Sequence, residues 1–283
     1  MIRKQPDTLS ARLVRVDWLD PREAAEAVAE PIVGAVNIPF SELGGRVGEL
    51  PPADEEIGIV GPAELARRVI VWLAERGRRS NWITTRSLSP TRKLDGSQIG
   101  RLWRPNAFLE EVIPQLKPGR ALDLACGTGR EAVYLAANGW DVTAVDVLPD
   151  ALERAEALER RYLRGPQRIR WVQCNLEKEP QRVESTYDLI TIFRYLNRPL
   201  VGILKSWLSP GGSVICETFT TLHRERHGRP SCPANVLKHG ELPTLFPEFT
   251  TRHHSEDWRG AAHTARLWTN LRTDEVMSSN THR

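Results

Sequence analysis

From residue 101 onward, short apolar runs alternate with longer amphipathic segments. The runs with the length and composition of strands are residues 121–124, 141–145, 169–173, 188–193 and 213–217. The segments with helical spacing between them are residues 130–138, 151–163 and 199–208. This alternation predicts a parallel, doubly wound α/β sheet. The last two runs, 249–254 and 264–271, have no helix between them, which predicts an antiparallel pair at one edge of the sheet.

A glycine-rich turn directly follows the first of these predicted strands. Residues 122–132 read Leu-Asp-Leu-Ala-Cys-Gly-Thr-Gly-Arg-Glu-Ala, and a helical pattern begins at once behind the turn. Gly127 and Gly129 let the backbone approach a ligand closely and adopt dihedral angles that side chains disfavour. The new helix points its N-terminal amides into the same space. The turn therefore predicts a nucleotide-like ligand at the carboxyl ends of the strands.

Two acidic residues bear on the kind of nucleotide. Asp123 lies four residues before Gly127, where a carboxylate repels a pyrophosphate but attracts an ammonium or a sulfonium group. S-adenosylmethionine carries both cations and no phosphate. Asp146 ends the next predicted strand, where a carboxylate can accept both hydroxyls of a ribose. The glycines alone do not decide, because Gly127-x-Gly129-x-x-Ala132 also satisfies the dinucleotide fingerprint.

With five landmarks in the same order, residues 101–271 resemble the class I S-adenosylmethionine-dependent methyltransferases. The landmarks are Asp123-Leu-Ala-Cys-Gly127-Thr-Gly129, Asp146, Gln173-Cys-Asn175-Leu176, Tyr187-Asp-Leu-Ile190 and Leu208-Ser-Pro-Gly-Gly212. Three further segments are most similar to the branch related to tellurite-resistance methyltransferases: Gly129-Arg-Glu-Ala132, Asn197-Arg-Pro-Leu200 and Glu217-Thr-Phe219. The resemblance implies a Rossmann-like methyltransferase sheet with S-adenosyl-L-methionine as its cofactor.

The resemblance also implies a set of cofactor-binding residues. They are Asp123, Ala125, Gly127, Gly129, Asp146, Val147, Asn175, Leu176 and Phe193. In this assignment Asp123 holds the methionine amino group, and Asp146 binds the ribose. Gly127 and Gly129 pass beneath the cofactor.

The adenine and the methyl acceptor are assigned in the same way. Val147 covers one face of the adenine, and Asn175 stands where the family usually has an aspartate that contacts the adenine amino group. Phe193 and Tyr195 face the methyl group and the acceptor. Tyr195 and Arg198 are the substrate-side candidates, with no catalytic base identified and no metal expected.

Residues 1–84 form a separate predicted domain, joined by a polar linker at residues 85–100 to the methyltransferase domain at residues 101–283. Strand patterns occupy residues 13–16, 35–38 and 57–60. A helix is predicted over residues 21–29 with Asp20 as its N-cap, and a second helix ends at Glu75. A small α/β domain is therefore expected ahead of the larger sheet.

This first domain resembles the rhodanese-like domains. The segments that carry the resemblance are Val14-Arg-Val-Asp17, Gly34-Ala-Val-Asn-Ile-Pro39 and Glu49-Leu-Pro51. In that family a cysteine after the next strand carries sulfur as a thiolate. Here the loop reads Val60-Gly-Pro-Ala-Glu64, and the first cysteine of the chain is Cys126. We therefore expect a domain without sulfur-transfer activity that serves docking or dimerisation.

Composition and charge exclude several other classes. No run approaches the ~18 apolar residues of a membrane span, and the first residues lack the apolar core of a signal peptide, so a cytoplasmic protein is expected. The four cysteines form no Cys-x-x-Cys pair, which argues against a disulfide framework or a structural zinc. A net charge of +3 is too small to indicate a nucleic-acid substrate. The expected partners are a small-molecule acceptor and, through the rhodanese-like domain, a protein partner or a second copy.

The resemblance implies a methyltransferase for a small molecule, and a thiol or a metalloid oxyanion suits the tellurite-resistance branch. Segment 217–241 is rich in arginine and histidine, and either forms a lid that attracts an anionic acceptor or is an exposed basic loop. His253, His254 and His263 are expected to face solvent on the edge strands. Two alternatives remain open: a non-catalytic S-adenosylmethionine-binding regulator and a nicotinamide-dependent oxidoreductase.

Overall fold

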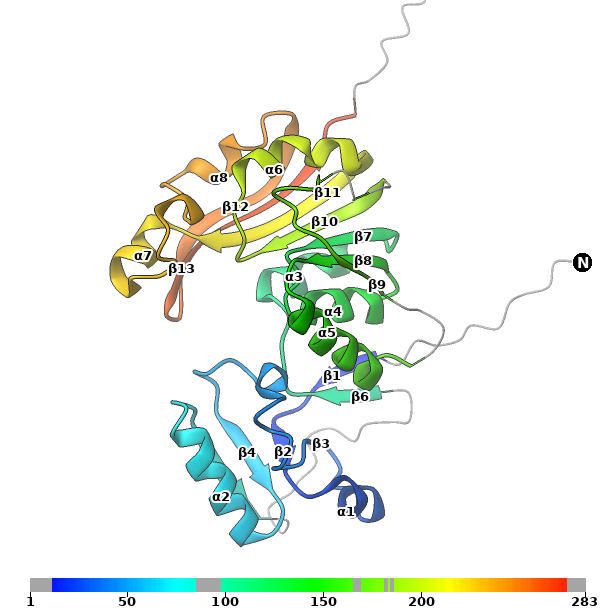
Figure 1. Ribbon diagram of the computed structural model, residues 1–283, viewed down its shortest axis with the longest axis vertical. Helices are drawn as coiled ribbons and strands as arrows, with labels where there is room; N and C mark the ends of the chain where they lie inside the picture. Colours follow the sequence, from blue (N-terminus) through cyan, green and yellow to red (C-terminus); the bar gives the residue numbers. More distant parts are fainter. Residues whose placement is uncertain (1–11, 85–97, 165–168, 181–182, 184–185, 274–283) are drawn as a thin grey trace, which may run out of the picture. The chain divides into compact units, whose positions relative to one another are not determined.

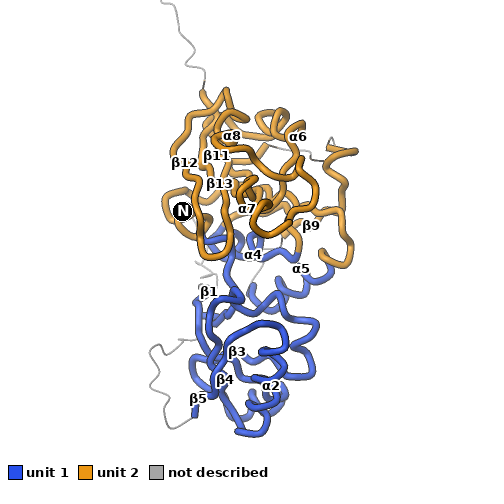
Figure 2. Tube along the Cα trace, turned by 90° about the vertical axis from the view of Figure 1, so that its left-hand side faces the viewer, with its two compact units in different colours: residues 1–107, 128–139, 153–168 blue, residues 108–127, 140–152, 169–283 orange. Residues whose placement is uncertain are grey.

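The computed structural model describes residues 12–84, 98–164, 169–180, 183 and 186–273. The chain divides into two compact units, coloured blue and orange in Figure 2. Unit 1 comprises Met1–Ala107, Thr128–Gly139 and Glu153–Arg168, and unit 2 comprises Phe108–Gly127, Trp140–Leu152 and Ile169–Arg283. This division differs from the predicted boundary, because two helical stretches of the second domain group with the N-terminal residues. Residues 85–97 of the predicted linker lie outside the described residues, and Gln98 to Gly100 belong to a strand.

Unit 1 contains a four-stranded parallel sheet with the order β3-β2-β4-β5. Its strands and helices are β2 (Trp18–Asp20), α1 (Ala24–Ala29), β3 (Ala35–Asn37), η1 (Val47–Glu49), β4 (Ile57–Val60), α2 (Ala63–Ala74) and β5 (Ser80–Ile83). A separate parallel pair joins β1 (Arg12–Arg15) to β6 (Gln98–Arg101). The helical stretches from the second half are α4 (Arg130–Ala137) and the later part of α5 (Pro149–Tyr162).

The core of unit 1 follows the apolar pattern of β4 and α2. All four residues of β4 are buried, as expected for a central strand of a parallel sheet. Helix α2 buries Ala66, Val69 and Leu73, which share one helical face. The predicted capping of α1 by Asp20 is wrong, because the carboxylate of Asp20 instead accepts hydrogen bonds from Arg22. Helix α1 starts later than predicted, and Glu23 is its N-cap residue.

Unit 2 is built on a seven-stranded sheet with the order β12-β13-β11-β10-β7-β8-β9 (Figure 1). The strands are β7 (Arg120–Leu124), β8 (Asp141–Asp146), β9 (Arg170–Gln173), β10 (Tyr187–Phe193), β11 (Leu208–Phe219), β12 (Phe249–Arg259) and β13 (Ala262–Leu271). Strands β7 to β11 are mutually parallel, whereas β13 runs antiparallel to both β11 and β12. The predicted Rossmann-like sheet with an antiparallel C-terminal edge is confirmed.

The helices of unit 2 lie before, between and after these strands. They are α3 (Ala107–Val112, counted here from Phe108), η3 (Ile113–Gln115), the start of α5, α6 (Arg198–Ile203), η5 (Leu204–Trp207), α7 (Thr221–His227), η6 (Pro233–Asn235) and α8 (Glu241–Thr244). One apolar core joins α6 and α8 to the face of the sheet that carries Leu122, Ile192 and Cys216 (Figure 1). In the described part of the chain, no helix combines the length and the apolarity that a membrane crossing requires.

The strand order reverses between β7 and β10, since the chain runs outward from β7 to β8 and β9 before it returns to β10. In open α/β sheets a ligand binds outside the carboxyl ends of the strands at such a reversal. Successive residues of a strand face opposite sides of the sheet. Because Leu122 and Leu124 belong to the core beneath α6 and α8, Asp123 faces the other side. The fold thus directs a carboxylate to the position where a ligand is expected.

Candidate active site

The chain turns sharply at the carboxyl end of β7. Ala125, Gly127 and Gly129 have positive φ angles of 54°, 53° and 77°, and Gly129 is the N-cap of α4. For a residue with a side chain, such as Ala125, this backbone costs roughly 1–2 kcal/mol, so the surrounding structure must hold it. A Cβ added to Gly127 would meet no atom within 4 Å. The space beside Gly127 is therefore open to a ligand that approaches the backbone.

Asp146 holds this turn from the neighbouring strand. It is the last residue of β8 and only 8% exposed. Its Oδ2 accepts the backbone N–H of Gly127 at 2.8 Å, and its Oδ1 accepts that of Leu148 at 2.9 Å. Each carboxylate oxygen has a second lone pair, so the group can still accept hydrogen bonds from ribose hydroxyls.

Asp123 and Asp146 lie on the same face of the sheet. Asp123 is opposite Ala144 on β8, so these two side chains share a face of the sheet. Asp146 lies two residues after Ala144 on the same strand, and its side chain therefore points to that face as well. Asp123 is 2% exposed, and its Oδ1 accepts the hydroxyl of Thr191 on β10 at 2.8 Å. The structure thus brings both predicted carboxylates to the same face of the sheet, beside the glycine turn.

Val147 and Asn175, two of the residues predicted around the adenine, line an open cavity of about 620 Å³ that extends along β9. Its lining residues are Val147, Arg170, Trp171, Val172, Gln173, Cys174, Asn175 and Glu179. Val147 is half-exposed, and Oδ1 of Asn175 accepts the backbone N–H of Glu177 at 3.0 Å. The side chain of Leu176 is buried in the core. Val147 and Asn175 thus line one cavity, and their contact with an adenine remains a prediction.

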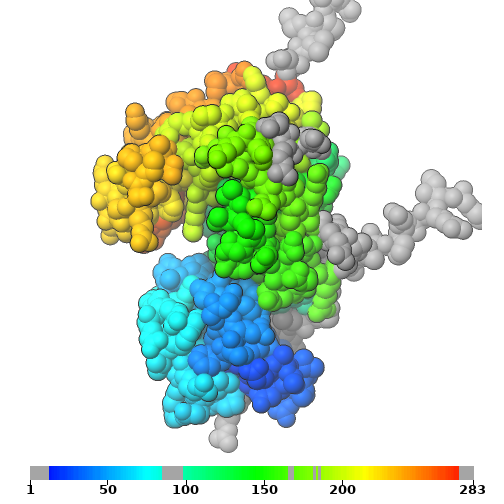
Figure 3. Space-filling model, viewed as in Figure 1, coloured from blue at the N-terminus to red at the C-terminus, as the bar shows by residue number. Residues whose placement is uncertain are grey.

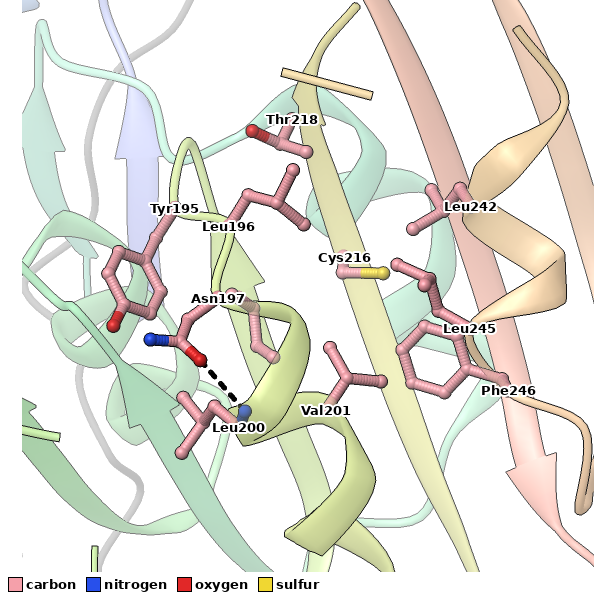
Figure 4. A pocket seen from close by; sticks show the side chains of 11 residues that line it. Tyr195, Leu196, Asn197, Leu200, Val201, Cys216, Thr218, Leu242, Leu245 and Phe246 are labelled. Atoms are coloured by element: carbon pink, nitrogen blue, oxygen red, sulfur yellow. Dashed lines mark hydrogen bonds between the residues drawn. The ribbon is translucent and has the colours of Figure 1, made fainter. Parts of the chain in front are cut away.

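Phe193 and Tyr195 lie at the carboxyl end of β10. Tyr195 lines a small apolar cavity of about 20 Å³ beside Cys216 (Figure 4), and its hydroxyl donates weakly to Glu177 at 3.5 Å. Burial, followed by the charge of Glu177, raises the pKa of Tyr195 above 10.0. Burial is also the largest cause that raises the pKa of the Cys216 thiol to about 12. At neutral pH both groups are protonated, so neither supplies a nucleophilic anion.

The guanidinium of Arg198 is taken up by protein acceptors. It donates to both carboxylate oxygens of Glu241, at 2.6 and 2.9 Å, and to the carbonyl oxygens of Ala234 and Val236, at 2.6 and 3.0 Å. The Glu241 carboxylate raises the pKa of Arg198, and Arg198 in turn is the largest cause that lowers the pKa of Glu241. This arrangement favours a structural role for Arg198, which fastens the segment before α8 to α6.

The segment predicted as a lid or a loop contains α7, which contacts the β12–β13 hairpin. The ring of His223 stacks on Phe219 at 4.2 Å, and its Nδ1 accepts the backbone N–H of His263 at 3.3 Å. His227 contacts the carbonyl oxygen of Ala261 at 2.8 Å. Burial, followed by His227 and His263, lowers the pKa of His223. Figure 3 shows this segment at the surface, at the left edge in yellow and orange.

The prediction that His263 faces solvent is wrong. Its side chain is 6% exposed, and its Nδ1 forms a hydrogen bond of 2.7 Å with the hydroxyl of Thr220. The reason is the strand order, since β13 lies between β11 and β12 and is not an edge strand. His253 and His254, on β12, are exposed as predicted. Within the described ranges, no group of three or more histidine, cysteine or acidic side chains is arranged to hold a metal ion.

Sequence reasoning did not single out two further residues of this face, Thr191 and Glu217. Thr191 binds Asp123, and Glu217 is opposite Phe193, with its Oε1 accepting the hydroxyl of Thr264 at 2.5 Å. The sequence signal that bears on them is the alternation of facing along β10 and β11. Counting in steps of two places Thr191 on the same face as Phe193, but only the observed register places both Thr191 and Glu217 on the face of Asp123.

Comparison with known proteins agrees with this geometry. Residues 121–212 match the family model described as a methyltransferase domain. A demethylmenaquinone methyltransferase of Clavibacter sepedonicus is 35% identical over 126 residues, which cover 43% of this chain and 49% of that protein. Nodulation protein S of Rhizobium tropici is 27% identical over 153 residues, which cover 51% and 61%. The chain thus spans about half the length of the first of these relatives and somewhat more of the second.

A solved structure is similar in fold. It concerns the conversion of a disulfide bond into a thioacetal group during echinomycin biosynthesis, and it aligns with a TM-score of 0.50 and 17% identity over 61% of this chain and 83% of that one. Residues 121–212 thus match a methyltransferase domain, and this range holds the turn after β7, strands β8 to β10 and the start of β11.

Proposed function

We propose that this chain transfers a methyl group from S-adenosylmethionine to a small-molecule acceptor. One observation supports this proposal most. Two buried carboxylates, Asp123 and Asp146, lie on one face of the sheet beside the open backbone of Gly127. Burying a charged carboxylate costs free energy unless hydrogen-bond donors or a cation compensate its charge. Both carboxylates already accept protein hydrogen bonds, and their remaining lone pairs suit a ligand with an ammonium group, a sulfonium and a ribose.

The chemistry of such a transfer divides between cofactor and protein. When bound, S-adenosylmethionine supplies a methyl carbon that its sulfonium already activates. Asp123 would hold the methionine amino group, and Asp146 would hold the ribose in a position fixed by the amides of Gly127 and Leu148. Phe193, at the end of β10, would exclude water from the line of attack. The protein thus contributes alignment, and no general base is assigned.

The finer parts of the proposal concern the acceptor and the first domain. A thiol or a metalloid oxyanion suits the resemblance to the tellurite-resistance branch. The parallel sheet of unit 1 is compatible with a rhodanese-like domain. All four cysteines of the chain lie from Cys126 onward, so no thiol is available in residues 1–84 to carry sulfur. We assign this domain a docking or dimerisation role in a cytoplasmic protein.

The first test is titration calorimetry of the full chain with S-adenosylmethionine and, separately, with NAD⁺. We expect heat of binding with the former only. The variant Asp123→Asn should weaken binding about tenfold to a hundredfold, because a hydrogen bond to a charged group contributes ~1.5–3 kcal/mol. The matched control is Asp141→Asn, an exposed residue at the opposite end of β8. Binding of NAD⁺ instead, or equal losses in both variants, would contradict the proposal.

A non-catalytic regulator would also bind S-adenosylmethionine, so turnover must be measured separately. Transfer of a radiolabelled methyl group to thiols, metalloid anions or other small metabolites would distinguish an enzyme from a regulator. A chain that binds the cofactor and methylates none of these acceptors would favour the regulator.

A further inference from the structure

Three buried side-chain nitrogen donors on β13 have no acceptor among the described residues. Arg266 has no exposed surface, and its Nε and Nη1 atoms have no partner there, while its Nη2 donates to Asp257 at 2.5 Å. Nε1 of Trp268 is likewise buried and has no partner in the described part of the chain. A buried donor without an acceptor costs about 1–3 kcal/mol, and more when it is charged. These donors therefore point to an acceptor-bearing group that binds here.

The register of the strands relates these donors to the proposed methyl site. Phe193 on β10 is opposite Glu217 on β11, and Glu217 is opposite Arg266 on β13. The neighbouring row consists of Asp123, Thr191, Ile215 and Trp268. Directly opposed residues share a face, so all these side chains lie on the face of Asp123. With adjacent strands ~4.8 Å apart, the backbone of Arg266 lies about 10 Å from that of Phe193.

The charges along this row change sign from one strand to the next. Glu217 is half-buried, and the hydroxyl of Thr264 orients its carboxylate. A negative group beside Phe193 disfavours an anion there, whereas the guanidinium of Arg266, paired with Asp257 through Nη2 alone, still offers Nε and Nη1 to an anion one strand further. The row fits an acceptor whose reacting end is neutral or basic and whose far end is negatively charged.

We propose that the methyl acceptor is a small carboxylic acid and that Arg266 and Trp268 bind its carboxylate. This inference rests on the proposed methyltransferase function. A carboxylate has about four lone-pair positions on two oxygens, enough for two guanidinium nitrogens and one indole nitrogen. Of the acceptors named above, a metalloid oxyanion is too small to reach from Phe193 to Arg266, whereas a thiol that also carries a carboxylate fits both ends of the row. Arg266 is then a specificity-determining residue.

The burial of Arg266 has a consequence that can be measured. Since its guanidinium is fully covered, a carboxylate reaches it only if the covering side chains move apart. Binding must therefore change the environment of the Trp268 indole N–H, which lies on the same face two residues away. This N–H gives a separate signal in a nitrogen–proton correlation spectrum, and the variant Trp268→Phe identifies it.

The experiment titrates the full chain, saturated with S-adenosylhomocysteine, with benzoate and acetate and in parallel with benzamide and acetamide. We expect the carboxylates, and not the amides, to shift the Trp268 signal saturably. Arg266→Gln should weaken this binding at least tenfold, and Arg266→Lys should retain part of it because the charge remains. Arg252→Gln, on the exposed strand β12, is the matched control and should bind as the parent chain does.

Three results would overturn the inference: no shift with any carboxylate, equal shifts with the amides, or unchanged binding in a folded Arg266→Gln. If that variant does not fold, the titration of the parent chain still decides. Calorimetry with S-adenosylmethionine on the same samples separates the two proposals. If the parent chain binds S-adenosylmethionine but no carboxylate, the acceptor assignment alone is overturned. If the parent chain does not bind S-adenosylmethionine, the proposed function is overturned, and with it the assignment of the carboxylate to a methyl acceptor.

Discussion

At Gly127 the backbone φ angle of 53° disfavours a side chain, although no atom lies within 4 Å of the place where a Cβ would stand. Two separate constraints therefore act on this residue. The first is conformational and belongs to the folded chain itself. The second is the open space that a ligand needs, and it acts only when the ligand binds. A substitution can distinguish them, because another glycine shares the first constraint alone.

We predict that Gly127→Ala and Gly228→Ala each lower the free energy of unfolding by ~1 kcal/mol, since both residues have positive φ angles and neither Cβ would meet a neighbour. Only Gly127→Ala should reduce the affinity for S-adenosylmethionine, because Gly228 ends α7, outside the cofactor turn. Urea unfolding and calorimetry check the two effects. Equal cofactor affinities in the two variants would argue against a ligand over Gly127.

At the scale of elements, the Arg198–Glu241 ion pair joins α6 to α8 and to the carbonyl oxygens of η6. The hydrogen bond from Arg198 lowers the pKa of Glu241 below 4.5. A carboxylate with a lowered pKa stabilises the fold above pH 4.5, and this contribution is lost as the pH falls through the lower, folded value. The segment before α8 should therefore loosen in acid.

The variant Glu241→Gln tests this dependence at neutral pH. At neutral pH, amide hydrogen exchange in residues 229–241 should accelerate severalfold in the variant, because Arg198 loses its charged acceptor. Below pH 4.5, where the parent chain also loosens, the difference in exchange rate between variant and parent should become small. Glu248→Gln is the matched control, since Glu248 forms an exposed ion pair with Lys205, and such pairs contribute little. Equally fast exchange in both variants would show that the Arg198–Glu241 ion pair does not stabilise the segment before α8.

Periodicity alone predicted most elements of the larger sheet, including its antiparallel strands. It could not predict that His263 is buried, because the order β12-β13-β11 depends on pairing between distant segments. It also missed α7, a helix of seven residues in a polar segment whose rings pack against the β12–β13 hairpin. Asp20 shows a third limit. Its carboxylate binds the guanidinium of Arg22 instead of the first amides of a helix, and a sequence pattern does not reveal which of these donors is bound.

The candidate site shows the same division. Asp123, Gly127 and Asp146 could be predicted because they belong to one strand–turn–helix segment and the strand that follows it. The roles of Thr191, Glu217 and Arg266 depend on register across four strands, which a single sequence does not specify. For Arg198, the sequence predicted a cation on the side of the substrate. It could not show that four oxygen atoms of the protein accept hydrogen bonds from this guanidinium.

At the scale of the whole molecule, Glu49 links the N-terminal residues of unit 1 to the end of α5. The side chain is 4% exposed. Its carboxylate accepts hydrogen bonds from Arg46 at 2.6 and 2.8 Å, from Arg161 at 3.0 Å and from the hydroxyl of Tyr162 at 3.0 Å. The ring of Tyr162 meets that of Trp103 edge-on at 5.4 Å. This buried cluster explains why the end of α5 groups with unit 1.

We predict that Glu49→Gln lowers the free energy of unfolding by about 1.5–3 kcal/mol, because Arg46 and Tyr162 lose a charged acceptor, while Arg46 keeps Glu42 and Arg161 is partly exposed to solvent. Glu64→Gln, which removes an exposed carboxylate paired with Arg67, should change it by less than about 1 kcal/mol. Chemical denaturation of the full chain measures both values. A loss for Glu49→Gln no greater than that of the control would show that the cluster does not hold unit 1 together.

The long sequence separation within this cluster affects how the protein is made. Residues 46 and 49 leave the ribosome early, whereas Arg161 and Tyr162 follow more than a hundred residues later. Until they emerge, the nascent N-terminal segment lacks two of the donors that its acidic side chain needs in order to be buried. The cluster around Glu49 thus cannot be completed until the end of α5, which follows the first two strands of the larger sheet in the sequence, has been translated.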